Sequence, residues 1–94
     1  MTERLLARLR ALPDVEEAPS QWTGGPAFWI DGREFVHLHG EAVEVRVTRR
    51  LVDRALEDER VVRRTRTSDW VVIPAAEEEL IVELAKLAAE VNRR

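Results

Sequence analysis

The chain has two histidines, His37 and His39, which are one residue apart in a segment with the composition of a β-strand. Because successive side chains of a strand point to opposite faces, both imidazoles should point the same way. Such a pair could bind a metal ion, transfer protons or form part of an ordinary polar surface. A metal ion would need a third ligand, and the sequence offers only carboxylates such as Glu34 or Glu44. We therefore expect no native metal site.

Proton transfer is the second possibility for the two imidazoles. If the next two strands form a hairpin with a two-residue turn, Glu44 lies opposite His37 and could fix the tautomer of its ring. The candidate catalytic residues are therefore His37, His39 and Glu44. The same strand face would also carry three candidate ligand-binding residues, Phe28, Phe35 and Arg46. The alternative is a polar sheet face with a cross-strand ion pair, which contributes a few tenths of a kcal/mol.

Three consecutive strands must position these side chains. We expect them at residues 28–30, 33–39 and 42–47, with Asp31-Gly32 as a type I′ turn and a second turn at Gly40-Glu41. Strict alternation then assigns one face to the core and the other to the histidines and phenylalanines. The side chains predicted for the core face are Trp29, Val36, Leu38, Val43, Val45 and Val47. A shift of one residue in the pairing would reverse the two faces.

Helical periodicity predicts three amphipathic helices around these strands, at residues 3–12, 49–59 and from 77 to the end. An apolar run at residues 69–73 predicts a fourth strand, and residues 15–18 and 61–66 could also be extended. The predicted fold is a single α+β domain over residues 1–94, in the order α-β-β-β-α-β-α. Its sheet is mainly antiparallel and four-stranded, with the helices on one face.

Composition excludes several classes of function. The net charge of −3 and the absence of cysteine argue against a general nucleic-acid binder and against thiolate chemistry. No apolar stretch reaches the roughly 18 residues of a membrane helix, and no signal peptide is recognisable, so we expect a cytoplasmic protein. Residues 46–66 hold eight arginines and four acids. A phosphate groove is conceivable there, but interleaved pairs such as Arg54 with Asp58 favour a solvated surface.

Ser68 and Asp69 could suggest a Ser-His-Asp triad, but Ser68 lacks the sequence context of a nucleophile elbow. A turn before the strand that begins near Trp70 is the better interpretation.

Two segments of the chain resemble a known family. Residues 33–39, REFVHLH, are similar to the grEFgHvH stretch of the bacterial luciferase-domain family, and residues 67–72, TSDWVV, are similar to its DSGWV segment. The resemblance covers about residues 20–92. Val36 replaces a frequent glycine, and Ser68-Asp69-Trp70 is a permuted form of the second motif. A link to fungal luciferases, which oxidise a pyrone-type luciferin, would imply that His37 and His39 act as acid–base residues without a metal.

The sequence favours a binding module for a small molecule or a protein, which uses the open sheet face and can form a homodimer through it. The alternative is a small enzyme without a cofactor, with His37 as the acid–base group, Glu44 orienting it, His39 assisting and Arg46 holding an anion. A weaker alternative is nucleic-acid binding through the arginines of residues 46–66. We predict no cofactor and no membrane partner.

Overall fold

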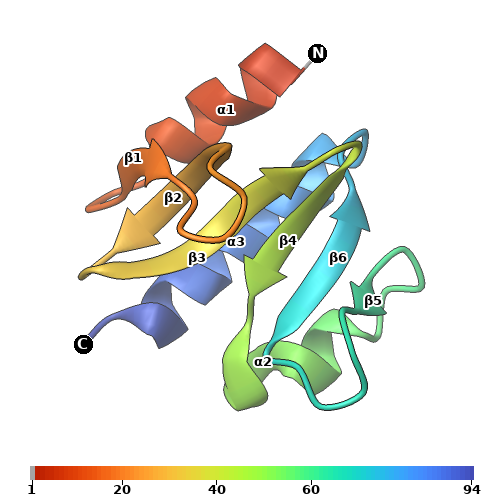
Figure 1. Ribbon diagram of the computed structural model, residues 1–94. Helices are drawn as coiled ribbons and strands as arrows, with labels where there is room; N and C mark the ends of the chain where they lie inside the picture. Colours follow the sequence, from red (N-terminus) through yellow and green to blue (C-terminus); the bar gives the residue numbers. More distant parts are fainter. Residues whose placement is uncertain (1) are drawn as a thin grey trace.

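A computed structural model describes residues 2–94 of the chain (Figure 1). The elements follow one another in the order α1-β1-β2-β3-β4-α2-β5-β6-α3. The helices are α1 (Thr2–Arg10), α2 (Thr48–Ala55) and α3 (Glu78–Asn92). The strands are β1 (Glu16–Pro19), β2 (Pro26–Ile30), β3 (Arg33–His39), β4 (Ala42–Arg46), β5 (Val62–Arg63) and β6 (Trp70–Pro74).

The strands form one antiparallel sheet in the order β1-β2-β3-β4-β6-β5. The predicted α+β class with an antiparallel sheet is confirmed, but the prediction of four strands is wrong, because the sheet has six. The two further strands, β1 and β5, are short and lie at opposite edges, where each pairs with a single neighbour. Short, largely exposed edge strands of this kind carry little hydrophobic alternation.

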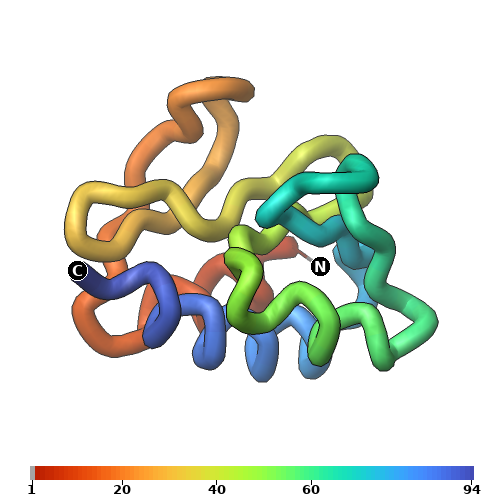
Figure 2. The backbone as a smooth tube through the Cα atoms, turned by 90° about the horizontal axis from the view of Figure 1, so that it is seen from below, coloured from red at the N-terminus to blue at the C-terminus, as the bar shows by residue number. Residues whose placement is uncertain are grey.

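The three helices lie on one side of the sheet, whereas the loop of residues 20–25 projects from the other side (Figure 2). We call these two sides the helical face and the helix-free face. The core lies between the sheet and the helices, and α3 packs along β3 and β4. Its largest contributors from the helices are Leu5, Leu9 and Ile81. Within residues 2–94, no helix combines the length and apolar character that a bilayer crossing requires.

Both predicted turns are present, and the second one, at Gly40-Glu41, sets the expected pairing of β3 with β4. Asp31 and Gly32 have φ values of 50° and 78°, and positive values at both central positions are those of a type I′ turn. Gly40 has a φ of 63° at the next turn. His37 therefore pairs with Glu44, and Leu38 pairs with Val43, as the sequence predicts.

The pairing of β2 with β3 differs from the prediction because β3 contains a β-bulge. Phe28 pairs with Val36 and Trp29 pairs with Glu34, so Phe35 is an extra residue without a partner on β2. Phe35 and Val36 are both fully buried in the core, although simple alternation would separate them. The bulge therefore shifts the alternation by one residue between Glu34 and Val36.

This shift corrects three of the predicted face assignments. Phe28 and Phe35 were predicted to lie with the histidines, but both are buried in the core with no exposed surface. Trp29 was predicted to face the core, but it pairs with Glu34 and is not a member of the core cluster. The assignment of Val36, Val43 and Val45 to the core is confirmed.

Candidate functional site

His37 lies on β3 at the helix-free face, with a carboxylate at each of its ring nitrogens. Its Nδ1 atom is 2.9 Å from Oε2 of Glu34, and its Nε2 atom is 3.3 Å from Oε1 of Glu44. The side chains of His37 and Glu34 are 2% and 0% exposed, and that of Glu44 is 8% exposed. We call these three residues the Glu34–His37–Glu44 cluster. The hairpin pairing of β3 with β4 places Glu44 beside His37, and the bulge in β3 places Glu34 on the same face of the sheet.

The contacts in this cluster are close approaches between ring nitrogens and carboxylate oxygens rather than well-directed hydrogen bonds. His37 Nδ1 and Glu44 Oε1 are buried and have no aligned hydrogen-bond partner among residues 2–94. A carboxylate at each nitrogen matches the two N–H groups of an imidazolium ring, whereas a neutral ring has only one N–H to donate. The cluster therefore places a carboxylate oxygen near each nitrogen of the buried ring.

Glu34 also anchors the loop of residues 20–25, which covers His37. Its carboxylate accepts hydrogen bonds from the Ser20 hydroxyl at 2.7 Å and from the Gln21 backbone N–H at 2.9 Å. The Ser20 hydroxyl oxygen in turn accepts the backbone N–H groups of Trp22 and Thr23, at 3.1 and 3.2 Å. A buried carboxylate that accepts several donors is a strong anchor for a loop. The 20–25 loop is consequently fixed to β3 across the helix-free face, in front of the sheet in Figure 1.

Trp22 of this loop and Trp70 of β6 enclose the His37 ring. The ring centroids of His37 and Trp70 are 4.8 Å apart, and those of His37 and Trp22 are 5.9 Å apart. The two indoles meet edge to face at 5.5 Å, a favourable arrangement for aromatic pairs. Trp70 is 7% exposed, whereas Trp22 remains 57% exposed. Trp22 therefore shields His37 from solvent, although Trp22 itself remains more than half exposed.

His39 is the accessible member of the histidine pair. Its side chain is 68% exposed, and its Nδ1 atom is 3.3 Å from Oε2 of Glu44. The same carboxylate has Nε of Arg64 at 3.4 Å from its other oxygen. The structure thus brings together the three predicted catalytic residues, His37, His39 and Glu44, but exposes only one imidazole.

Arg46 is engaged elsewhere, although it was predicted to hold an anion near His37. Its Nη1 donates to Oδ1 of Asn92 at 2.6 Å, and its Nη2 lies 3.4 Å from Oδ2 of Asp69. The amide of Asn92, which is fully buried, donates back to the Arg46 carbonyl oxygen at 2.8 Å. Arg46 therefore joins the end of β4 to the end of α3. Of the ligand-binding candidates, Phe28 and Phe35 lie in the core and Arg46 lies in this junction.

The sequence interpretation missed Ser20 and Trp22, and it considered Glu34 only as a metal ligand. Glu34 gave a usable signal, because strict alternation would have placed its charge on the same face as Val36. A charge assigned to a core position indicates that the alternation is broken nearby. Ser20 gave no such signal, since its contact with Glu34 spans fourteen residues of chain.

Among residues 2–94, no group of three or more histidine, aspartate or glutamate side chains has the geometry of a metal site. Residues 65–68 form a turn closed by the Ser68 N–H and the Thr65 carbonyl oxygen at 3.2 Å, and the Ser68 hydroxyl accepts the backbone N–H of Trp70 at 3.0 Å. The Asp69 carbonyl oxygen accepts the N–H groups of Val47 and Thr48. The contacts of Ser68 support the interpretation of this segment as a turn, whereas Asp69 joins it to the end of β4.

The comparisons with known proteins leave the family of the chain open. No protein-family model, curated protein or solved structure matches it. The resemblance to the luciferase-domain family therefore stays a prediction from residues 33–39 and 67–72. These two segments contribute His37 and Trp70, whose rings are in contact at the helix-free face.

Proposed function

We propose that this chain is a protein-binding module whose binding surface is the helix-free face and whose partner is a second copy of the chain. The observation that carries the proposal is the position of Trp22. More than half of this indole is exposed, yet Trp70 and His37 hold it in one place and Glu34 anchors its loop. Rigid, partly exposed tryptophans are the residues that most often dominate binding energy at protein interfaces.

A second exposed apolar side chain supports this choice of surface. Val62 of β5 is 61% exposed and pairs with Val72 of β6, two residues from Trp70. Because side chains two residues apart share a face of a strand, Val62, Val72 and Trp70 lie on the same side of the sheet. Trp22, which packs on Trp70, adds to the same apolar surface. His39 and Arg64 supply polar groups around it.

The charges at the two sheet edges support a second copy as the partner. On the helix-free face, the β1 edge carries Glu16, and the β5 edge continues into the half-exposed Arg64. Their neighbours Glu17 and Arg63 are bound within the chain, to Arg10 and to the Ser68 carbonyl oxygen. A two-fold axis parallel to the strands would place the acidic edge of each copy over the basic edge of the other. An interface of this symmetry uses the same patch twice and is self-complementary. Charge complementarity of this kind favours the correct alignment of partners.

The burial of His37 favours a macromolecular partner over a small substrate. The ring is 2% exposed beneath Trp22 and Trp70, so no reacting group could reach it without displacement of the 20–25 loop. Among the eight arginines of residues 46–66, Arg46, Arg60, Arg63 and Arg64 already have protein partners. This leaves a nucleic-acid interface with fewer free cations than the sequence suggests.

The proposal is tested by sedimentation equilibrium of the full chain between about 5 and 500 µM, over which a modest dimer should assemble by mass action. The mean mass should rise from that of the 10.8 kDa chain towards twice that value. Trp22→Ala should weaken association at least about tenfold, since removal of a central tryptophan costs on the order of 2 kcal/mol.

Leu87→Ala is the matched control, because Leu87 is a large exposed apolar residue that lies on α3, away from the proposed surface. This variant should associate as the parent chain does, and circular dichroism should show that both variants remain folded. A chain that stays at 10.8 kDa throughout the concentration range, or an equal effect of the two substitutions, would reject the proposal.

A further inference from the structure

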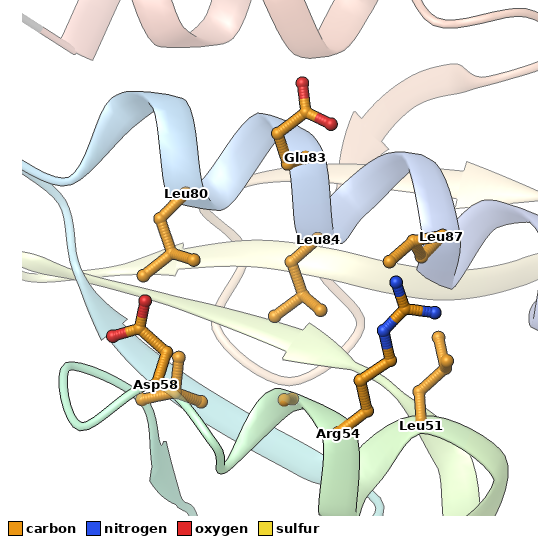
Figure 3. A pocket seen from close by; sticks show the side chains of 9 residues that line it. Leu51, Arg54, Asp58, Leu80, Glu83, Leu84 and Leu87 are labelled. Carbon is orange, nitrogen blue, oxygen red and sulfur yellow. The ribbon is translucent and has the colours of Figure 1, made fainter.

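A pocket of about 130 Å³ lies between α2 and α3 (Figure 3). These helices are on the helical face, on the opposite side of the sheet from the 20–25 loop (Figure 2). Six apolar side chains form most of its lining: Leu51, Ala55, Val61, Leu80, Leu84 and Leu87. Ala55, Val61 and Leu84 at its floor are buried, whereas Leu87 at its rim is 37% exposed. An apolar cavity of about 150 Å³ can hold a molecule the size of benzene. The pocket is therefore large enough for a chain of about five or six carbons.

Three charged residues surround this pocket, and two of them are acids with their own cations. Asp58 is 2.6 Å from Nη2 of Arg60, and Glu83 is 3.4 Å from Nζ of Lys86. Side-chain and backbone hydrogen bonds from Arg60 lower the pKa of Asp58 to about 2, so its charge is already matched. Figure 3 shows the Glu83 carboxylate pointing away from α2.

Arg54 is the third charged residue, and it differs from the two acids. The sequence predicted an ion pair between Arg54 and Asp58, but Asp58 pairs with Arg60 instead. The Arg54 side chain makes no ion pair or hydrogen bond with residues 2–94, because Asp58 is bound by Arg60. Its guanidinium extends from α2 towards Leu87 at the rim of the pocket (Figure 3). The Arg54 guanidinium, which has no ion-pair partner among residues 2–94, thus lies beside an apolar pocket.

We infer that this pocket binds a small aliphatic carboxylic acid, with its hydrocarbon chain between α2 and α3 and its carboxylate on Arg54. The apolar lining suits a chain without polar groups, and the guanidinium suits a carboxylate, which it can bind through two parallel hydrogen bonds. The neutralised acids at the rim add little repulsion to the incoming anion. A cation would be repelled by Arg54, and a neutral chain would leave its guanidinium unmatched.

The test uses hexanoate as the probe and methyl NMR spectra of the full chain as the readout. Hexanoate should shift the methyl signals of the lining leucines, Leu51, Leu80, Leu84 and Leu87, with a dissociation constant of about 1–20 mM, as expected for eight non-hydrogen atoms. Hexanamide, which has the same shape without the charge, should bind at least about fivefold more weakly. The Trp22 signals should not move, so the outcome is independent of the association experiment.

Arg54→Gln should weaken hexanoate at least about fivefold and leave hexanamide unchanged, because only the charge contact is lost. Arg50→Gln is the matched control, since Arg50 is an exposed arginine of the same helix that does not line the pocket. Both variants should keep the dispersed spectrum of the folded chain. Unchanged methyl signals at about 50 mM hexanoate, equal binding of hexanamide, or equal effects of the two substitutions would each overturn the inference.

Discussion

Phe35→Ala is expected to lower the free energy of unfolding by about 3–5 kcal/mol, as is usual when a buried phenylalanine leaves a cavity. Phe35 is the extra residue of the bulge on β3, and it is fully buried in the core. Its ring therefore contributes both to the packing of the core and to the shift in alternation that places Glu34 beside His37. Urea unfolding followed by circular dichroism measures the loss.

His39→Ala is the matched control for this variant, because His39 lies on the same strand but its side chain is 68% exposed. It should change the free energy of unfolding by less than about 1 kcal/mol. If Phe35→Ala cost as little as His39→Ala, the phenyl ring would lie at the surface. The strict alternation predicted from the sequence would then describe β3 better than the bulge does.

Glu34→Ala is expected to cost about 2–4 kcal/mol, because it leaves buried polar groups without their acceptor. The Ser20 hydroxyl, the Gln21 N–H and the Nδ1 atom of His37 all approach this carboxylate. The substitution should destabilise the 20–25 loop as well as the whole fold. Amide exchange of Trp22 and Thr23, whose N–H groups depend on the position of Ser20, should accelerate at least about tenfold.

Glu41→Ala is the control for the removal of a glutamate, since Glu41 is exposed at the turn between β3 and β4. Its backbone carbonyl accepts the Ala75 N–H, and this contact survives the substitution. Stability and exchange of the 20–25 loop should remain close to those of the parent chain. Equal stability of the Glu34 and Glu41 variants would show that Glu34 does not anchor the loop.

The sequence predicted the central hairpin well because its signals are local. Asp31-Gly32 and Gly40 provide the positive φ values that two tight turns require, and the valines of β4 alternate strictly. The Gly40 turn and the alternation of β4 determine which residue of β4 lies opposite His37. The pairing of His37 with Glu44 therefore followed from a few neighbouring residues.

The rest of the site could not be predicted because it depends on contacts between distant residues. A single extra residue on β3 exchanges the faces of every residue beyond it, and nothing in the composition of the strand requires that residue. The closure of the site depends on Ser20 and Trp22 of one loop, on Glu34 of β3 and on Trp70 of β6, which are far apart in the sequence. The one sequence feature that indicates the bulge is Glu34, because strict alternation would place its charge on the core face together with Val36.

The most direct test of the account is a two-dimensional NOE spectrum of the full chain with assigned aromatic side chains. The central claim is that the bulge brings Glu34 and His37 to the helix-free face, where they hold Trp22 over the histidine ring. We predict cross-peaks from the Trp22 indole protons to ring protons of both His37 and Trp70, and cross-peaks from the Phe35 ring to core methyl groups. Cross-peaks from Phe35 to His39 together with none between Trp22 and His37 would contradict the claim.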